Sequence, residues 1–344
     1  MLLELISIIK LKLLLNKIKV TPNIEVTFLE NGHLIGAAMI LIEINYPGEE
    51  PINVLFTGDY NNKNEFLNLH ELPMRVRNKR MSVVIESTYG DTSVEEINHG
   101  FFSEKVLEAI EERKTIILPV FSLGRSQEIL LRLKELQDDD KLDVNVPIYF
   151  DGKLAQAYTA LYLNSKDLID ESKKDFFPRN LIFANSEIRE QLLQTNDCKI
   201  IVTTSGMGTY GPAQVYIPYF ISAKKALILF TGYTAEGTLG ADLKNATEGE
   251  FVKIGGLICK KFADVSYCNE FSAHAKSEEL IELLKKFNNL RAILVNHGQT
   301  KTKDIFAEKI LTEIDIDEVG ILNREYFFRI GSYGIVKTLS TKFK

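Results

Sequence analysis

The sequence predicts an α/β protein of two domains, and three observations support this. Short β-rich runs open the chain, strand and helix patterns alternate through its middle, and further strands close it. Apolar strands with intervening helices are typical of a parallel sheet covered on both faces. The order predicts an outer domain formed by residues 1–90 and 272–344, interrupted by an inserted domain at residues 91–271. The length of 344 residues suits two domains.

The β-rich start and the closing segment each have recognisable patterns. Runs of β-branched and aromatic residues bounded by turn signals predict strands at 25–30, 39–44, 52–58 and 82–88. Near the end, SEELIELLKKF (277–287) predicts a helix, with Ser272 and Ser277 as candidate caps. RAILVNHG then predicts a strand, and GILNREYFFRI with GIVKTL predicts a final strand pair.

The middle of the chain has the alternation expected of a parallel sheet. Helical spacing predicts helices at 103–114 and 126–137, separated by a strand at 115–121. Four further apolar runs end in Gly, Asn, Ser or Tyr and predict strands in VPIYFDG, NLIFAN, CKIIVTTSG and KALILFTGY. The triple aspartate at 138–140 is typical of a solvated loop.

The N-terminal stretch MLLELISIIKLKLLLNKIKV is apolar, but charged residues interrupt it. It contains no uninterrupted apolar run of about 20 residues, which argues against a membrane span. It also has no small-residue cleavage site of the kind a signal peptide carries. Apolar residues recur at helical spacing, which predicts an amphipathic helix packed on a sheet, at Leu2, Leu5, Ile6, Ile9 and Leu13.

Composition narrows the functional classes. Hydrophobic residues make up 45 % of the chain, enough for a substantial core, and the net charge of −6 argues against a general nucleic-acid coat. A locally basic cleft remains compatible with that charge. The three cysteines form no C-x-x-C pair. Their spacing argues against a disulfide framework and a zinc finger, and it indicates a reducing, cytoplasmic compartment.

Five residues with metal-binding or acid–base side chains lie at or beside the ends of apolar runs. They are His33 in NGHLIG, Asp59 in LFTGDYN, Glu86 in VVIESTYGD, His274 in NEFSAHAKSEEL and His297 in ILVNHGQ. The ends of strands converge at one edge of an α/β sheet, where sites form. Histidine and carboxylate together are the usual ligands of a hydrolytic zinc. The other two histidines, at 70 and 99, have polar neighbours and are expected at the surface.

Each of these residues also has a structural interpretation. His33 and His297 could be turn residues, and Asp59 after Thr-Gly could form an Asx-turn. Glu86 could cap a loop, and His274 could make a hydrogen bond at the start of a helix. Taken singly, each signal is weak. Their recurrence at five strand ends or loops favours a shared site.

Eight blocks in order resemble one family, the β-CASP group of metallo-β-lactamase-fold ribonucleases. The blocks are GHLIGAAMILIE, LFTGDYN, VVIESTYGD, PVFSLGRSQEIL, TSGM, GYTAEGTLG, FSAHA and NHG, and the resemblance runs from about residue 25 to about residue 300. It implies a truncated metallo-β-lactamase αββα sandwich with an inserted Rossmann-like parallel-sheet β-CASP domain. It also implies a zinc-dependent ribonuclease that uses two zinc ions to process RNA.

The resemblance assigns a role to each candidate residue. His33 matches a ligand of one zinc, Asp59 the carboxylate that bridges two zincs, and His297 the last ligand, on the second zinc. His274 matches the general acid for the leaving oxygen, and Glu86 matches the carboxylate that orients this histidine. The chemistry agrees, because two close metal ions stabilise attack on phosphorus and a paired carboxylate raises histidine basicity.

The family's H-x-H-x-D-H motif does not occur in the 32 residues before His33. The expectation is therefore an N-terminally incomplete first domain, with reduced or absent activity alone. Expected partners are RNA and either a second copy or a complementing subunit. The alternative is a non-catalytic RNA-binding or scaffold subunit of an RNA-processing complex. Hydrolysis of another substrate is a third hypothesis, against which FSAHA and ESTYGD argue because both accompany the nucleic-acid branch.

Two features of the inserted segment could contact RNA. The Gly-rich stretch TSGMGTYGP (204–212) could present backbone N–H groups to a phosphate. A plain turn at the end of a strand explains it equally well. Arg125 could contact the RNA backbone or pair with a nearby carboxylate.

Overall fold

The computed structural model describes residues 16–316, 318–323, 326–331 and 334–339. The N-terminal helix predicted from Leu2 to Leu13 lies outside these residues. The chain divides into two compact units. The first, here called the split unit, comprises Met1–Glu96 and Ala273–Lys344, and the second, the inserted unit, comprises Ile97–Ser272.

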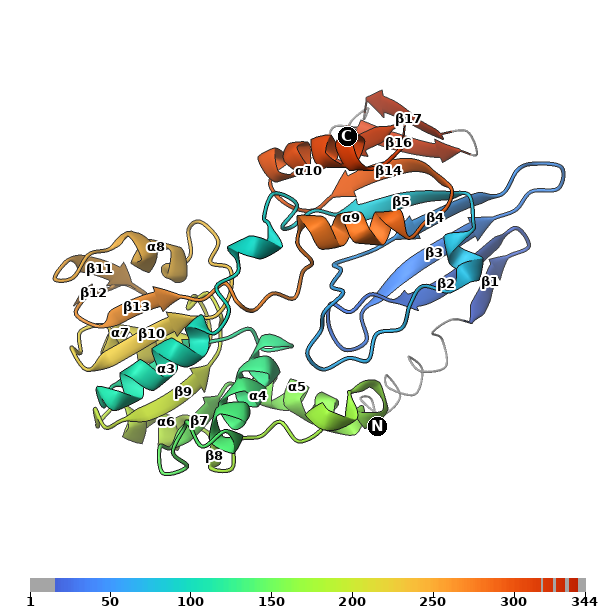
Figure 1. The fold of residues 1–344 in the computed structure, drawn as a ribbon. Helices are drawn as coiled ribbons and strands as arrows, with labels where there is room; N and C mark the ends of the chain where they lie inside the picture. Colours follow the sequence, from blue (N-terminus) through green and yellow to red (C-terminus); the bar gives the residue numbers. More distant parts are fainter. Residues whose placement is uncertain (1–15, 317, 324–325, 332–333, 340–344) are drawn as a thin grey trace. The chain divides into compact units, whose positions relative to one another are not determined.

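The split unit is built on a seven-stranded mixed sheet with the order β1-β2-β3-β4-β5-β14-β15 (Figure 1). Its strands are β1 (Lys17–Thr21), β2 (Ile24–Glu30), β3 (Ala38–Ile44), β4 (Ile52–Phe56), β5 (Met81–Glu86), β14 (Leu290–Asn296) and β15 (Val319–Ile321). The first four strands pair antiparallel, as a meander. From β4 onward the pairing is parallel. Consequently β2, β4, β5 and β14 all end at the same edge of the sheet.

One face of this sheet carries the main core of the split unit. Alternation along β3 buries Met39 and Leu41 while Ile40, between them, is 37 % exposed. The buried residues pack against the helices α9 (Ser277–Lys285) and α10 (Thr300–Glu313). The short elements α2 (Met74–Arg77) and η1 (Val94–Glu96) complete the unit's helices among the described residues.

The opposite face is covered in part by a two-stranded hairpin. Its strands are β16 (Tyr326–Gly331) and β17 (Gly334–Leu339), paired antiparallel. The buried Val84 and Leu294 of the sheet pack there with Phe328 and Ile335. The sequence pattern suggested one strand over 320–330, but the structure divides this stretch into β15 and β16.

The inserted unit is a six-stranded parallel sheet with the order β13-β10-β6-β9-β7-β8. The strands are β6 (Thr115–Pro119), β7 (Ile148–Asp151), β8 (Leu181–Ala184), β9 (Lys199–Thr203), β10 (Ala226–Phe230) and β13 (Asp264–Tyr267). Every residue of β6, β9 and β10 is buried. Such strands need cover on both faces, which confirms the predicted parallel sheet between helices.

The helices of the inserted unit lie between its strands in sequence. They are α3 (Phe101–Glu111), α4 (Arg125–Asp138), α5 (Lys153–Asn164), α6 (Ser186–Leu192), α7 (Ala213–Phe220) and α8 (Leu239–Asn245), with the short η2 (Lys166–Leu168) and η3 (Glu171–Lys173). A hairpin of β11 (Phe251–Ile254) and β12 (Leu257–Lys260) precedes β13. None of the described helices is both long and apolar enough to cross a membrane.

The start of α9 differs from the prediction. Ser277 is its first helical residue, and neither Ser277 nor Ser272 caps it, because Lys276 occupies the N-cap position without a side-chain cap bond. Instead, the Glu279 carboxylate accepts the Lys276 N–H at 2.9 Å. This bond satisfies one of the N–H groups left free where a helix begins. It also fixes the chain just after His274.

Candidate metal centre

The structure brings together all five site residues predicted from the sequence, at one edge of the split unit's sheet. His33, Asp59 and His297 follow β2, β4 and β14, Glu86 ends β5, and His274 precedes α9. Their potential ligand atoms form two trios, each with all atoms within 4.8 Å of one another. One trio is His33, Asp59 and His274, and the other is Asp59, Glu86 and His297. Asp59 belongs to both.

His33 sits in a bend that needs glycine. Gly32 has φ +70°, and a Cβ there would lie 2.0 Å from the backbone oxygen of Asn61. This bend turns the imidazole so that Nδ1 donates to the backbone oxygen of Ala273 at 2.7 Å. With Nδ1 carrying the proton, Nε2 keeps its lone pair and lies 3.7 Å from Asp59 Oδ2. A histidine held in this way is prepared to bind a metal through Nε2.

The loop that carries Asp59 is tied down on both sides. The Asn31 amide donates to the backbone oxygens of Asp59 at 2.7 Å and Thr57 at 3.2 Å. The Thr57 hydroxyl accepts the Glu86 N–H at 3.2 Å, which links this loop to the end of β5. The Asp59 carboxylate itself is 40 % exposed, and its Oδ1 lies 2.8 Å from Nδ1 of His297. The side chain is thus held in position yet open to solvent or a ligand.

Asp59 and His297 shift each other's acidity in opposite directions. The hydrogen bond from His297 lowers the pKa of the Asp59 carboxyl. Burial opposes this by raising the pKa, and the charges of the nearby histidines lower it further. The same hydrogen bond raises the pKa of His297, and burial opposes it. Mutual stabilisation of a carboxylate and an imidazolium is expected at this distance.

His297 adopts a backbone conformation that is unusual for histidine, with φ +55°. The next residue, Gly298, has φ +77°, and a Cβ there would lie 2.7 Å from the backbone oxygen of Ser87. The Ser87 hydroxyl hydrogen-bonds the backbone oxygen of His297 at 2.8 Å. The sequence N-H-G is therefore required by a sharp turn that directs the imidazole toward Asp59.

His274 is paired with a fully buried carboxylate. Its Nδ1 lies 2.9 Å and 3.1 Å from the two oxygens of Glu86, whose side chain is 0 % exposed. Glu86 also accepts the backbone N–H of Tyr60. The Ala275 N–H donates to the Tyr60 backbone oxygen at 2.7 Å, so the segment carrying His274 is anchored to the same loop. Tilted against His274 lies the ring of His33, with centroids 4.7 Å apart.

These side chains fit zinc. Imidazole nitrogen and carboxylate oxygen are ligands that zinc takes at about 2.0–2.2 Å, so two donors on a tetrahedral ion lie about 3.4 Å apart. The 3.7 Å between His33 Nε2 and Asp59 Oδ2 is close to that spacing and too long for a hydrogen bond. In addition, Glu86 and the Ala273 carbonyl bind the Nδ1 atoms of His274 and His33, the usual arrangement behind metal-bound histidines.

Two neighbours of His274 were not predicted from the sequence. The Tyr89 ring lies edge-on to His274, with centroids 6.1 Å apart. The Lys276 ammonium lies 3.6 Å from the centre of the Tyr89 ring, and the Lys276 residue is 5 % exposed. Tyr89 lies inside the block VVIESTYGD, and Lys276 directly follows the block FSAHA. Their proximity in the sequence to Glu86 and His274 was the available signal.

The predicted RNA contacts of the inserted unit have other partners. Arg125 is buried and donates from Nε to Glu128 at 2.8 Å, so it pairs with a carboxylate, the second of its two predicted alternatives. In the Gly-rich loop 204–212, the N–H groups of Ser205 and Gly208 donate to oxygens of the same loop at 2.9 Å. These N–H groups stabilise the turn and are not directed at a ligand.

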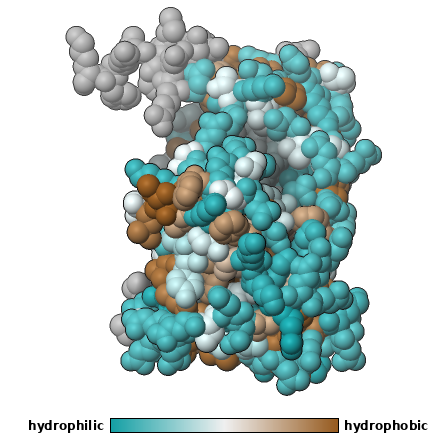
Figure 2. All heavy atoms as spheres, turned by 90° about the vertical axis from the view of Figure 1, so that its left-hand side faces the viewer, coloured by the Kyte–Doolittle hydropathy of each residue, from teal (hydrophilic) through white to brown (hydrophobic). Residues whose placement is uncertain are grey.

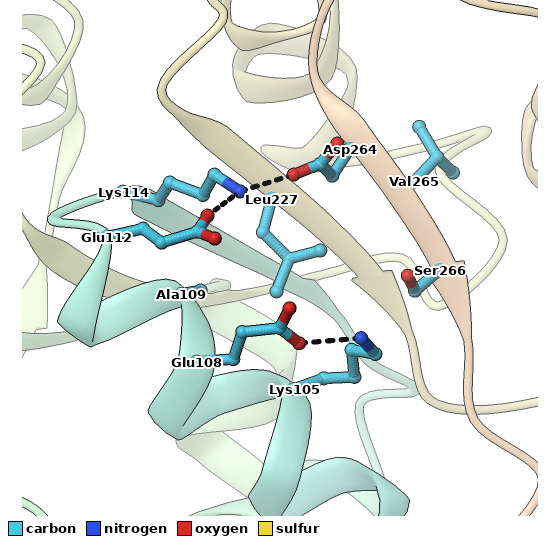
Figure 3. A pocket seen from close by; sticks show the side chains of 9 residues that line it. All are labelled: Lys105, Glu108, Ala109, Glu112, Lys114, Leu227, Asp264, Val265 and Ser266. Carbon is cyan, nitrogen blue, oxygen red and sulfur yellow. Dashed lines mark hydrogen bonds and ion pairs between the residues drawn. The ribbon is translucent and has the colours of Figure 1, made fainter.

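Figure 3 shows a polar pocket of about 310 Å³ between α3, β10 and β13 of the inserted unit. Lys105 lies 2.6 Å from Glu108, and Lys114 lies 2.5 Å from Asp264 and also pairs with Glu112. Its two ammonium groups are therefore outnumbered by three carboxylates. No predicted site residue lines this pocket, and its charge does not suit a phosphate.

Two domain families match the chain. Residues 126–243 match the Beta-Casp domain, which places that match inside the inserted unit. Residues 262–319 match the Zn-dependent metallo-hydrolase RNA specificity domain. The second match includes His274 and His297. The segment that carries these two histidines is therefore similar to a domain described as belonging to Zn-dependent metallo-hydrolases.

Whole-chain relatives agree with these matches. An RNase J-like protein of Methanocaldococcus jannaschii is 33 % identical over 311 residues, which cover 87 % of this chain and 69 % of the relative. Transcription termination factor FttA of Methanosarcina mazei is 28 % identical, covering 89 % of this chain and 50 % of the relative. Integrator complex subunit 11 of Danio rerio is 27 % identical, covering 87 % of this chain and 49 % of the relative. The chain thus spans about two thirds of the first and half of the other two. It belongs to the β-CASP family of RNA-processing metallo-hydrolases with the metallo-β-lactamase fold.

Proposed function

We propose that this chain is a zinc-dependent ribonuclease that hydrolyses RNA phosphodiester bonds, with the histidine–carboxylate cluster as its active site. The observation that carries the proposal is the pair of donor trios sharing Asp59. Family membership supports it, since the relatives include a protein named for RNase activity. The division into a metallo-β-lactamase domain (1–90 and 272–344) and a β-CASP domain (91–271) is part of the same proposal.

In this proposal His33, Asp59 and His297 would hold zinc, and Asp59 is the donor that both trios share. Zinc, when bound, supplies Lewis-acid activation of the phosphodiester. Each ligand must be held in the right orientation. The Ala273 carbonyl orients His33, and the N-H-G turn orients His297. Such support is needed because metal affinity falls steeply when a ligand loses its orienting bond.

His274 and Glu86 are proposed as the acid and its positioning residue. With Nδ1 bound to Glu86, the Nε2 atom of protonated His274 donates a proton to the leaving oxygen. Glu86 is buried and held by the Tyr60 N–H, so it stays in place while the proton moves.

A second candidate function is a non-catalytic RNA-binding subunit. One observation favours it: His297 Nδ1 and Asp59 Oδ1 already form an ion pair at 2.8 Å. An ion pair of this kind holds the loop without metal. This candidate requires RNA binding that persists with chelator and is never followed by hydrolysis.

One experiment separates the two candidates. The full chain is purified without chelator, its zinc is measured by elemental mass spectrometry, and cleavage of a 5′-labelled single-stranded RNA is followed on gels. We expect the wild type to bind zinc at the remaining donors and to cut RNA slowly, because the H-x-H-x-D-H motif does not occur in this chain, and we expect loss of both zinc and cleavage in Asp59→Ala. The control is Asp139→Ala, an exposed residue directly after α4. Zinc-free wild-type protein that binds RNA without cutting it would establish the second candidate instead.

A further inference from the structure

The hairpin β11–β12 of the inserted unit presents one face to solvent. Directly opposed residues are Phe251 with Lys260 and Lys253 with Ile258, so these four side chains share a face. All four are exposed, Phe251 at 68 % and Ile258 at 76 %. This outer face alternates apolar and basic residues in both directions.

The other face of the hairpin fixes it to the unit. Val252, Ile254 and Cys259 pack against the buried cluster that includes the core of the parallel sheet. Ile254 is 3 % exposed. Because the inner face is anchored in this way, the outer face is a preformed surface. Figure 2 shows exposed hydrophobic residues among hydrophilic ones on the side of the molecule that carries it.

The outer face has an excess of positive charge. Among the residues that the structure describes, neither Lys253 nor Lys260 forms an ion pair with a carboxylate. Lys260 Nζ lies 5.8 Å from the ring centre of Phe251 and 5.1 Å from that of Phe262. Just before β11, the Glu250 carboxylate accepts the N–H of Thr247 at 2.8 Å and, within the described part of the chain, pairs with neither lysine. The chain as a whole is negative, at −6, so this is a local feature.

We infer that the outer face of the β11–β12 hairpin binds single-stranded RNA, an inference that rests on the proposed function. Aromatic and apolar side chains stack on bases, and flanking lysines contact the phosphates, which is how unpaired strands are bound without sequence preference. Lys260 is the cross-strand partner of Phe251, and its Nζ lies 5.8 Å from the centre of that ring, so both side chains are within reach of one nucleotide. The hairpin ends at Lys260, and the match to the RNA specificity domain begins at residue 262, so neither matched domain includes it.

Charge argues against a second copy of the chain as the occupant. A two-fold contact places the same patch on itself, which would bring Lys253 and Lys260 against their own counterparts. Burying four ammonium groups without counter-charges is costly. RNA supplies the missing negative charge at regular intervals.

The test uses the full chain and a fluorescein-labelled single-stranded 20-nucleotide RNA, with binding measured by anisotropy in chelator so that hydrolysis cannot interfere. The double variant F251A/I258S removes the apolar residues, and K253S/K260S removes the charges. We expect the first to raise Kd roughly tenfold, through lost stacking. For the second we expect a tenfold rise at low salt and a log–log salt slope that is shallower by about 1.4, or about 0.7 per lost phosphate contact.

Matched controls remove similar groups elsewhere. Tyr46→Ala deletes an aromatic residue that is 47 % exposed, and K19S/K286S deletes two exposed lysines that make no ion pair within the described part of the chain. These variants should bind RNA as the wild type does. Circular dichroism and urea unfolding establish that all variants are folded.

Several outcomes would overturn the inference. Hairpin variants that bind RNA as tightly as the wild type would overturn it. If the wild type nevertheless cleaves RNA when zinc is supplied, the proposed function stands. Binding to phosphatidylserine vesicles is measured in parallel by sedimentation. Hairpin variants that keep wild-type RNA affinity but lose vesicle binding would assign the face to a membrane instead. Wild-type protein that neither binds nor cleaves RNA refutes the hairpin inference and the proposed function together.

Discussion

Asp59 is the residue on which both donor trios depend. Its two oxygens face different histidines, Oδ2 toward His33 at 3.7 Å and Oδ1 toward His297 at 2.8 Å. A longer or shorter side chain would reach one of these partners and miss the other. At this position, charge and length are therefore both constrained, and neither Glu nor Asn reproduces Asp.

The role of His274 can be separated from that of the ligands. His274 belongs to the first trio, so its geometry suits either a ligand or an acid. Our proposal predicts that His274→Ala keeps zinc within about twofold of the wild type and lowers the RNA cleavage rate by at least about 100-fold, the usual contribution of general acid catalysis. Elemental mass spectrometry and single-turnover cleavage measure the two quantities.

The control for that experiment is His70→Ala, whose side chain is 78 % exposed and pairs with Glu30 at the surface. It should change neither zinc content nor cleavage. If His274→Ala loses zinc as completely as Asp59→Ala does, His274 is a ligand and the acid must be sought elsewhere.

Gly298 predicts a stability effect at the same site. An alanine there would combine a positive φ with a Cβ 2.7 Å from the Ser87 oxygen. We expect Gly298→Ala to lower the free energy of unfolding by about 2 kcal/mol or more. Gly255→Ala is the control, because Gly255 also has a positive φ, +57°, but open space around it. An equal loss in both variants, measured in urea, would show that the close approach to Ser87 contributes nothing.

Residue types and their positions at strand ends were sufficient to predict which side chains meet. Their orientation could not be predicted from the sequence. The bond from His33 to the Ala273 carbonyl joins residues far apart in the chain, and no local pattern indicates it. Which nitrogen of His33 is available to a metal follows from that bond alone.

At the scale of elements, several long periodic segments were predicted well, but the helices α5 and α10 and the β11–β12 hairpin were not predicted. The helix predicted at 126–137 is Arg125–Asp138, and the predicted strand at 39–44 is Ala38–Ile44. The β11–β12 hairpin was missed because its strands have four residues each and, unlike the equally short β7 and β8, each includes a lysine that breaks or ends the apolar run. Strands this short carry too few residues for a period of two to be distinguished.

The contact between α9 and α10 predicts a pH dependence. Burial raises the pKa of Glu278, but the Lys309 ammonium at 2.8 Å and nearby hydrogen-bond donors, among them the Val94 N–H, lower it to about 2. A carboxyl with a lowered folded-state pKa stabilises the fold above its ordinary value of 4.5, and this stabilisation is lost as the pH falls from 4.5 toward 2.

The Glu278 side chain is 43 % exposed, so solvent screening keeps its contribution below about 1 kcal/mol. We expect Glu278→Gln to lower the free energy of unfolding by that amount at pH 7 and by progressively less below pH 4.5. Urea unfolding at several pH values measures the difference from the wild type, with the exposed Glu282→Gln as control. A difference that grows on acidification would contradict the assignment.

For the whole molecule, the fold class follows from the alternation of patterns, and the comparisons confirm the family. Strand order could not be obtained in the same way. Neighbouring strands such as β5 and β14 are separated by the entire inserted unit. Pairing of that kind depends on packing between distant segments.

Two compact units predict two unfolding transitions, since units of this size usually have cores of their own. If zinc binds only the folded split unit, removing it with a chelator should lower one transition temperature and leave the other unchanged. Zinc at about 100 times its Kd would contribute about 2.7 kcal/mol to that unit. Differential scanning calorimetry measures both transitions. In Asp59→Ala the chelator should have no effect, and a shift of the other transition alone would place zinc binding outside the split unit.

The order of the site residues along the chain has a consequence for biosynthesis. His33, Asp59 and Glu86 precede the inserted unit, while His274 and His297 follow it. A ribosome therefore releases the first three long before the last two, and the cluster cannot close until residue 297 has emerged. During that interval β5 lacks its neighbour β14, and the unpaired edge of β5 is open to aggregation. Folding of the inserted unit, which is one continuous segment of the chain, would shorten that interval by bringing the two halves of the split unit together.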